Sequence, residues 1–254
     1  MVKKEDSIAV FDSGVGGISV LRELVKLMPG ENYLYFGDSA NAPYGKKTTG
    51  QVRELTLQNA EMLFERGAKA LVVACNTATS AAIDLLREIF PDRLILGIEP
   101  ALKPAISQFP TGNIGIMATD VTLREEKLQR LMAQFDTAAV HRISAPGLVE
   151  LIEAGKADDP ETEALLTEIL APYAEKLDAL VLGCTHYPFV KNAISKVLGE
   201  KTALFDGGEG TARQTRRLLE QADLLNEGVG SVTMENSAGT PALLELSYRL
   251  LREC

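Results

Sequence analysis

Short apolar runs alternate with amphipathic stretches along almost the whole chain. The apolar runs are rich in Val, Ile, Leu and Ala and are bounded by turn-forming residues, as is typical of buried strands. They predict strands at Ile8–Phe11, Tyr33–Phe36, Ala70–Ala74, Leu94–Gly97, Ile114–Ala118, Ala179–Gly183, Ala203–Phe205 and Val232–Glu235. Apolar positions recur at helical spacing between them, as in Gly17–Leu27, Gln51–Arg66, Ser80–Phe90 and Leu123–Gln134. This alternation predicts an α/β fold with mainly parallel sheets and helices on both faces.

The first half of the chain resembles the second. Ser13 in "IAVFDSG" and Thr119 in "IGIMATD" each place a hydroxyl in a turn after an apolar strand. Ser13 precedes Cys75 by 62 residues and Thr119 precedes Cys184 by 65, and each cysteine ends a further apolar run. The repeat predicts two similar α/β domains related by a pseudo-twofold, with both cysteines facing a cleft between them.

Two segments that contain several prolines or glycines suggest where the chain passes between these domains. The prolines of "IEPALKP" at 98–104 mark one crossing, and the glycines of "FDGGEG" at 205–210 mark the return. We therefore expect a discontinuous first domain at 1–98 plus 208–254 and a second domain at 99–207.

Composition and charge exclude several classes of function. The 254 residues are 46% hydrophobic and carry a net charge of −9. No apolar run is long enough for a membrane helix, and the N-terminal apolar run is too short for a signal peptide, so we expect a cytoplasmic protein without a membrane partner. The basic cluster "RQTRR" at 213–217 is short and has acidic neighbours, so nucleic-acid binding is not expected.

The cysteines and histidines do not suggest a metal site. The three cysteines include no C-x-x-C pair, which argues against a redox motif or a zinc ribbon. The only histidines, His141 and His186, show no ligand spacing. We expect no metal, and we assign no role to Cys254, the last residue.

Cys75 and Cys184 occupy equivalent positions at strand–helix junctions. Free cysteine is also a common core residue. A helix N-terminus, however, stabilises a thiolate, and a thiol with an ordinary pKa of about 8.5 is a credible general acid and base. The occurrence of two thiols at equivalent strand–helix junctions therefore favours a catalytic role for them over a role in core packing. The polar residues that follow them are Asn76, Thr77, Thr185 and His186.

Other polar positions allow a structural and a functional interpretation. "FDSGVGG" at 11–17 matches neither G-x-G-x-x-G nor a Walker sequence, so it is either a tight turn or a loop whose amides bind an anion. Asp12 directly follows an apolar strand, where an ionised side chain needs a partner or a function. His186 is a candidate proton partner for Cys184, although a lone histidine is usually structural.

Four motifs together resemble a known family. "FDSGVGG", "PYG", "ACNTAT" and "GCTHYP", in this order, are similar to those of the glutamate racemases, within the cofactor-independent amino-acid racemase superfamily, and the resemblance extends from about Ile8 to Ala238. It implies two α/β domains with the active site between them, racemisation of glutamate without a pyridoxal cofactor, a supply of D-glutamate for peptidoglycan, and a homodimer.

The resemblance also implies roles for individual residues. Cys75 and Cys184 match the two catalytic acid/bases, the first deprotonating D-glutamate and the second L-glutamate. Asp12, His186 and Glu153, in "LIEAG", match the ionisable residues that assist them. The positions that match substrate-binding residues are Asp12, Ser13, Tyr44, Gly45, Asn76, Thr77, Thr119, Thr185 and His186.

The chain departs from the family pattern in one region. Ala101 and Val121 stand where glycine is usual, and "LREEKL" at 123–128 replaces the usual small and aromatic residues. The short segment before the first strand differs from the extended form that needs a cell-wall precursor as activator, so we expect no such requirement.

Three alternative functions stay open at this point. The chain is also compatible with a racemase for aspartate or another acidic substrate, or with a protein that binds an acidic ligand between two domains without catalysis. A secondary interaction with another protein would leave no recognisable pattern.

Overall fold

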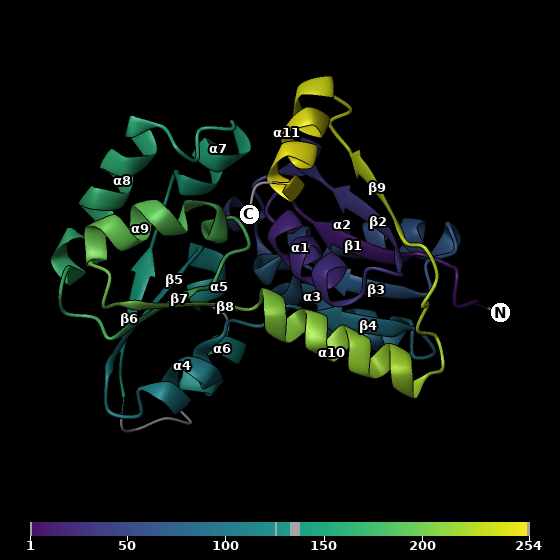
Figure 1. Ribbon diagram of the computed structural model, residues 1–254, viewed down its shortest axis with the longest axis horizontal. Coiled ribbons are helices and arrows are strands. Elements are labelled where there is room, and N and C mark those ends of the chain that lie inside the picture. Colours follow the sequence, from purple (N-terminus) through teal and green to yellow (C-terminus); the bar gives the residue numbers. More distant parts are fainter. Residues whose placement is uncertain (1, 125, 133–137, 253–254) are drawn as a thin grey trace.

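Two parallel β-sheets, each covered by helices, lie side by side in the computed structural model, which describes residues 2–124, 126–132 and 138–252 (Figure 1). The first sheet has the strand order β4-β3-β1-β2-β9, and the second has the order β6-β5-β7-β8. All the pairings are parallel. The strands of the first sheet are β1 (Ile8–Asp12), β2 (Asn32–Gly37), β3 (Ala70–Val73), β4 (Leu94–Gly97) and β9 (Ser231–Asn236). Those of the second are β5 (Asn113–Ala118), β6 (Ala139–Ser144), β7 (Ala179–Leu182) and β8 (Ala203–Asp206).

The two sheets repeat one topology. The order β4-β3-β1-β2 of the first sheet reappears as β8-β7-β5-β6 in the second, so β1 corresponds to β5 and β3 to β7. The strands that precede Ser13 and Thr119 are thus equivalent, as are those that precede the two cysteines. This confirms the predicted fold class of two similar, mainly parallel α/β units.

Helices cover both faces of the first sheet. Successive residues of a strand face opposite sides. Ile8 and Val10 pack against α1 (Ile18–Leu27), α10 (Gly208–Gln221) and α11 (Pro241–Arg252). Ala9 and Phe11 pack against α2 (Thr49–Glu65) and α3 (Asn76–Ile89). The helices that follow β8 therefore return to the first sheet (Figure 1).

The second sheet is covered in the same way. One of its faces packs against α7 (Leu148–Glu153), α8 (Pro160–Leu170) and α9 (Lys191–Leu198). The other packs against α4 (Leu102–Gln108), α5 (Asp120–Arg124) and α6 (Glu126–Met132). No helix in the described part of the chain is both long and apolar enough to cross a membrane.

Three elements differ from the sequence prediction. The strand β6 was not predicted, because its residues "AVHRIS" are largely polar and it lies at the sheet edge with most of its side chains at least partly exposed. α3 begins at Asn76 rather than Ser80. The single helix predicted over Leu123–Gln134 corresponds to α5 and α6, with residues 125, 133 and 134 outside the described residues.

Candidate functional site

The two cysteines line one small cavity, each from its own sheet. Cys75 follows β3, and Cys184 follows the equivalent strand β7. Both are buried, with 5% and 7% of their surface exposed. The carboxyl ends of parallel strands are where α/β folds usually bind ligands, and here those of both sheets meet.

Most of the predicted site residues line this cavity. They are Ser13, Tyr44, Gly45, Cys75, Asn76, Thr77, Thr119, Cys184, Thr185 and His186. Asp12 and Glu153 lie behind the lining residues instead, in contact with Thr185 and His186 respectively. Pro43 and Val149 also line it and were not predicted. The departures at Ala101 and Val121 are not among its lining residues.

Cys75 is the N-cap residue of α3. Its Sγ accepts a hydrogen bond from Ala78 N at 3.5 Å and lies 3.7 Å from Ser13 Oγ. Burial, with a further contribution from the charge of Asp12, raises the pKa of Cys75 to about 12, and these two hydrogen bonds oppose the rise. Cys75 is therefore a thiol at neutral pH, ready to donate a proton.

Asp12 links the two domains beneath the cavity. Its carboxylate accepts hydrogen bonds from Gly14 N at 2.8 Å and from Thr185 Oγ1, on the opposite domain, at 2.8 Å. Burial raises the pKa of Asp12, while the charge of His186 and these hydrogen bonds act in the opposite direction. The carboxylate thus fixes the turn that follows each of the strands β1 and β7.

Cys184 has a charged partner instead. Its Sγ lies 3.7 Å from His186 Nδ1, and His186 Nε2 lies 2.6 Å from Glu153 Oε1. Burial alone would lower the pKa of His186, but Cys184 and Glu153 outweigh this effect and raise the pKa well above its usual value. The two thiols therefore have different electrostatic environments, because an imidazolium lies beside Cys184 whereas the charge of Asp12 acts on Cys75.

A cluster of threonine hydroxyls bridges the domains at the side of the cavity. Thr77 Oγ1, at the start of α3, lies 3.1 Å from Thr119 Oγ1 and 3.4 Å from Thr122 Oγ1. Thr122 is fully buried, and we did not predict it. Its position one helical turn after Thr119 was the available signal, because residues three apart lie on one face of a helix.

The "PYG" turn is held by a carboxylate that the sequence analysis also missed. The Tyr44 hydroxyl donates to Asp38 Oδ2 at 2.7 Å, and Asp38 is buried. Ser237, beyond β9, donates to the other oxygen of Asp38 at 2.7 Å. A Cβ at Gly45 would lie 3.0 Å from Thr119 Cβ, so glycine allows this turn to approach the second domain closely.

Asn76 lines the cavity with a side-chain amide that is not used within the described part of the chain. Both its nitrogen and its oxygen are buried, and neither has a hydrogen-bond partner among the described residues. A buried, unpaired amide is costly unless a ligand or water completes it. Asn76 is therefore suited to hold a polar ligand.

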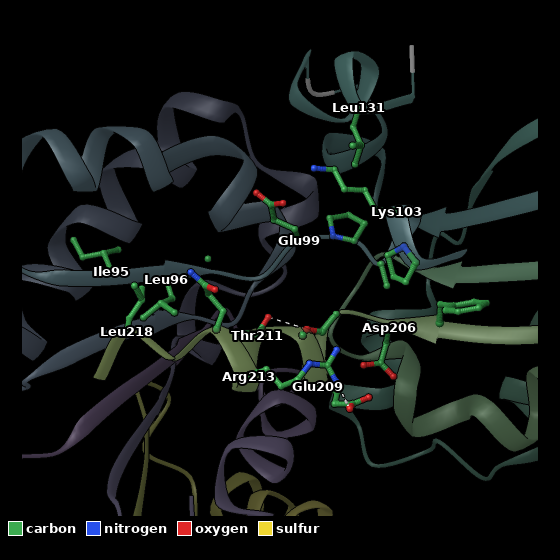
Figure 2. Close-up of a pocket in the computed structure, with 18 of the residues that line it drawn as sticks. Ile95, Leu96, Glu99, Lys103, Leu131, Asp206, Glu209, Thr211, Arg213 and Leu218 are labelled. Carbon is green, nitrogen blue, oxygen red and sulfur yellow. Dashed lines mark hydrogen bonds and ion pairs between the residues drawn. The ribbon is translucent and has the colours of Figure 1, made fainter. Parts of the chain in front are cut away.

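A larger cavity elsewhere does not share these features. It has a volume of about 560 Å³ and lies where the chain passes between the two sheets, lined by Glu99, Lys103, Asp206, Glu209, Thr211 and Arg213 among others (Figure 2). Arg213 is paired with Glu209, and Thr211 Oγ1 donates to Gly207 O at 2.8 Å. None of the predicted site residues lines it.

The described residues contain no group of three or more His, Cys, Asp or Glu side chains placed to hold a metal ion. The chemistry of the small cavity, as built from this chain, thus rests on thiols, an imidazole, carboxylates, hydroxyls and amides.

Comparison with known proteins identifies relatives over nearly the full length. A family model described as "Asp/Glu/Hydantoin racemase" matches residues 9–215. A glutamate racemase of Clostridium perfringens is 47% identical over 252 residues, covering 98% of this chain and 97% of its own.

Solved structures with bound ligands show the same architecture. The glutamate racemase of Escherichia coli, in complex with L-glutamate and the activator UDP-MurNAc-ala, superposes with a TM-score of 0.87 at 34% identity, covering 97% of this chain and 95% of its own. That of Francisella tularensis, in complex with D-glutamate, has a TM-score of 0.85 at 27% identity, with 98% and 95% covered. With its family match, its close relatives and its repeated two-sheet fold, the chain belongs to the Asp/Glu/Hydantoin racemase family.

Proposed function

We propose that this protein interconverts L-glutamate and D-glutamate, with Cys75 and Cys184 as the two acid/base groups and without a cofactor. The observation that carries the proposal is the placement of two buried thiols, one from each half of a repeated fold, on a single cavity. The relatives named above are glutamate racemases, which supports glutamate as the substrate.

The reaction explains the need for two thiols. Racemisation removes the α-proton from one face of the carbon and delivers a proton to the other face. One thiol, as thiolate, accepts the α-proton while the electron pair of the broken C–H bond stays on the substrate. The opposite thiol then donates its proton to that carbon and becomes the thiolate. Atoms and charge balance, and the two cysteines have exchanged protonation states.

The environments of the two thiols suit this exchange. Cys75 is held as a thiol by burial and the nearby charge of Asp12, and is ready to donate. Cys184 lies 3.7 Å from the His186 ring, whose raised pKa places a positive charge beside this thiol. In the proposed conversion of L-glutamate, Cys184 is the group that accepts the α-proton, which is the role that the family resemblance implies for it.

Hydrogen-bond donors in the cavity would stabilise the negative charge that develops on the substrate when its α-proton is removed. An amino-acid α-proton is far less acidic than a thiol, so the developing negative charge must be spread into the α-carboxylate and held there. The donors available for this are the N-terminus of α3, the Thr77 hydroxyl and the amide of Asn76. The hydroxyls of Ser13, Thr119 and Thr185 donate to other side chains of the protein and would have to turn toward the substrate to join them. The same donors would hold an anionic substrate on a protein of net charge −9.

The cavity must enlarge before glutamate can enter. Its free volume is about 20 Å³, which is room for about one water molecule. Because residues from both domains line it, a small separation of the domains opens it, and closure around the substrate then excludes water from the reacting carbon.

The proposal is tested by incubating the purified protein with L-glutamate, and separately with D-glutamate, without added cofactor, while following circular dichroism. We expect the signal to decay to zero from either enantiomer. A stable signal with glutamate and a decaying one with aspartate would move the substrate to aspartate. Binding of either amino acid without loss of optical activity would instead indicate a binding protein.

Three finer statements stay predictions. The supply of D-glutamate for peptidoglycan and the homodimer rest on the family resemblance, and the cytoplasmic location rests on the sequence pattern. Sedimentation of the purified protein tests the homodimer directly. The domain limits of 1–98 plus 208–254 and 99–207 also stay a prediction.

A further inference from the structure

Tyr35 has a buried hydroxyl directed at the active-site turn. It lies on β2, is 1% exposed, and its hydroxyl donates to Gly14 O at 2.6 Å. Burial raises its pKa well above the usual value, so the hydroxyl keeps its proton and remains a donor. No role was assigned to this residue from the sequence, and it does not line the cavity.

The hydroxyl fixes a peptide group that has a second function. Gly14 O and Val15 N belong to the same planar peptide unit, so holding the carbonyl also sets the direction of the N–H. Val15 N donates to Glu153 Oε1 at 2.7 Å. Tyr35, on the first domain, thereby determines where that domain offers a hydrogen bond to α7 of the second.

Glu153 connects this peptide group to His186, which lies beside Cys184. The same oxygen, Oε1, lies 2.6 Å from His186 Nε2, and His186 Nδ1 lies 3.7 Å from Cys184 Sγ. The contact between the turn and the carboxylate is close, because a Cβ at Gly14 would lie 1.8 Å from Glu153 Oε1. A shift of the 14–15 peptide therefore moves the carboxylate that orients His186.

From this geometry we propose that Tyr35 is a positioning residue for the Cys184 half of the reaction, acting through the 14–15 peptide, Glu153 and His186. The expected effect on kcat rests on the proposed function, because it is an effect on racemisation. Its structural consequence, the coupling of Tyr35 to His186, does not depend on which substrate the protein uses.

Tyr33 provides a matched control on the same strand. It is also buried, and its hydroxyl donates to the carbonyl oxygens of Leu24 and Met28, both at 2.9 Å, at the end of α1. Tyr33→Phe thus deletes the same group from the same strand, but both carbonyls keep a backbone N–H partner and the tyrosine has no path to Glu153.

The test compares Tyr35→Phe with Tyr33→Phe by kinetics and by NMR of the histidine rings. We expect Tyr35→Phe to lower kcat about tenfold relative to Tyr33→Phe, because small displacements of catalytic groups are costly. We also expect it to lower the pKa of His186, since a loosened Glu153 stabilises the imidazolium less. The chain has only two histidines, so the His186 titration is resolved from that of His141.

A double-mutant cycle separates positioning from general damage. If Tyr35 acts through Glu153, Tyr35→Phe has little further effect on kcat in a Glu153→Gln background. A full Tyr35→Phe penalty in that background would overturn the proposal. So would equal kcat values and equal His186 titrations in Tyr35→Phe and Tyr33→Phe.

Two further substitutions keep the test valid if Tyr35→Phe does not fold. 4-Fluorophenylalanine at position 35 fills the space of the hydroxyl without donating, and 4-aminophenylalanine retains a donor. We expect the first to show the loss of kcat and the lowered pKa of His186, and the second to resemble the wild type; equal behaviour of the two would contradict the proposal. Absence of racemisation by the wild type would overturn the proposed function, while the His186 titration would still decide the coupling.

Discussion

At the scale of single residues, the two halves of the site differ in how each thiol is held. Cys75 faces Ser13 and the charge of Asp12, whereas Cys184 faces His186 and, through it, Glu153. A repeated fold has thus placed two like groups in unlike electrostatic surroundings. In the proposed conversion of L-glutamate, Cys75 is the thiol that donates and Cys184 the one that accepts.

Removing either thiol is expected to stop the reaction in both directions. Each of Cys75→Ala and Cys184→Ala deletes a group that acts as base in one direction and acid in the other. We expect racemisation to fall by at least about a thousandfold from either enantiomer, with a far-UV spectrum like that of the wild type. Cys254→Ala, outside the described residues, is the control and should keep its activity. Full activity in either of the first two variants would refute the two-thiol assignment.

The pKa of Cys75 also predicts a pH dependence of stability. Folding raises it from about 9 to about 12, so the folded state holds this proton more tightly than the unfolded state. The contribution is fully present below the unfolded pKa and is lost as the pH rises through the window from 9 to 12. Between pH 8 and pH 10 the loss for this group alone is about 1–2 kcal/mol.

Denaturant unfolding of the wild type and Cys75→Ala at both pH values measures this difference. We expect the free energy of unfolding of the wild type to fall by about 1–2 kcal/mol more than that of Cys75→Ala. Equal losses in the two proteins would show that folding leaves the pKa of Cys75 unchanged.

The residue pattern and the family resemblance together named most of the residues that line the cavity, and two of the misses have a common cause. Cysteines, glycines and hydroxyls placed directly after strands stand out in a sequence. Asp38 and Tyr35 act on the site through other residues, and no local pattern marks such a contact. They became visible only when the turn at Gly14 and the tyrosine at position 44 had been placed in space.

At the scale of elements, continuous apolar strands were predictable, whereas of the two polar edge strands β9 was predicted and β6 was not. β1, β3, β5 and β7 are buried on both faces, so nearly every residue in them is apolar. β6 lies at an edge, and its "AVHRIS" sequence resembles a loop. The start of α3 was misplaced because Cys75, an unusual N-cap residue, takes the place of the expected Ser or Thr.

A buried ion pair fastens the ends of the strands opposite the site. Lys69 Nζ, just before β3, lies 2.5 Å from Glu31 Oε2, just before β2, and both side chains are fully buried. Lys69 also donates to the carbonyl oxygens of Lys4 and Leu224, and Glu31 Oε1 accepts from Asn226 N at 2.8 Å. The pair thus ties the N-terminal segment and the loop before β9 to the first sheet.

Breaking this pair should destabilise the protein without altering its chemistry. Lys69→Met leaves the Glu31 carboxylate buried and unpaired, and we expect the free energy of unfolding to fall by about 3–5 kcal/mol. Lys69→Met/Glu31→Gln removes the uncompensated charge and should recover about half of this or more. Lys4→Ala, which removes only an exposed ion pair with Asp223, is the control and should cost less than about 1 kcal/mol. A small loss in Lys69→Met would show that water reaches the carboxylate.

At the scale of the whole molecule, the two domains close over the site through contacts on either side of it. Asp12 and Thr185 join them beneath the cavity, and Thr77 and Thr119 at its side. An ion pair between Lys46 and Glu150 joins the "PYG" turn to α7, next to the lining residues Gly45 and Val149. Opening for the substrate must break such contacts, and closing must restore them.

The role of the Lys46–Glu150 pair in domain closure can be tested by reversing one charge and then restoring the pair with the two charges exchanged. Glu150→Lys places two cations across the mouth of the cavity, and we expect KM to rise by up to about fivefold at low salt, because exposed pairs contribute less than about 1 kcal/mol. The exchanged variant Lys46→Glu/Glu150→Lys should restore the wild-type value. At 1 M salt, where charges are screened within about 3 Å, the three proteins should converge. If the exchanged variant is no better than Glu150→Lys, the pair does not contribute to closure.

The central claim, that two groups on opposite faces transfer the proton, is tested most directly by following deuterium in the reaction. L-Glutamate is incubated with the wild-type protein in D₂O, and both enantiomers are analysed at early conversion by mass spectrometry and α-proton NMR. The account predicts that the D-glutamate formed carries α-deuterium while the remaining L-glutamate keeps its α-proton, because the incoming proton comes from the second thiol. D-Glutamate that retained the original α-proton, or L-glutamate that exchanged as fast as it racemised, would indicate a single base and contradict the account.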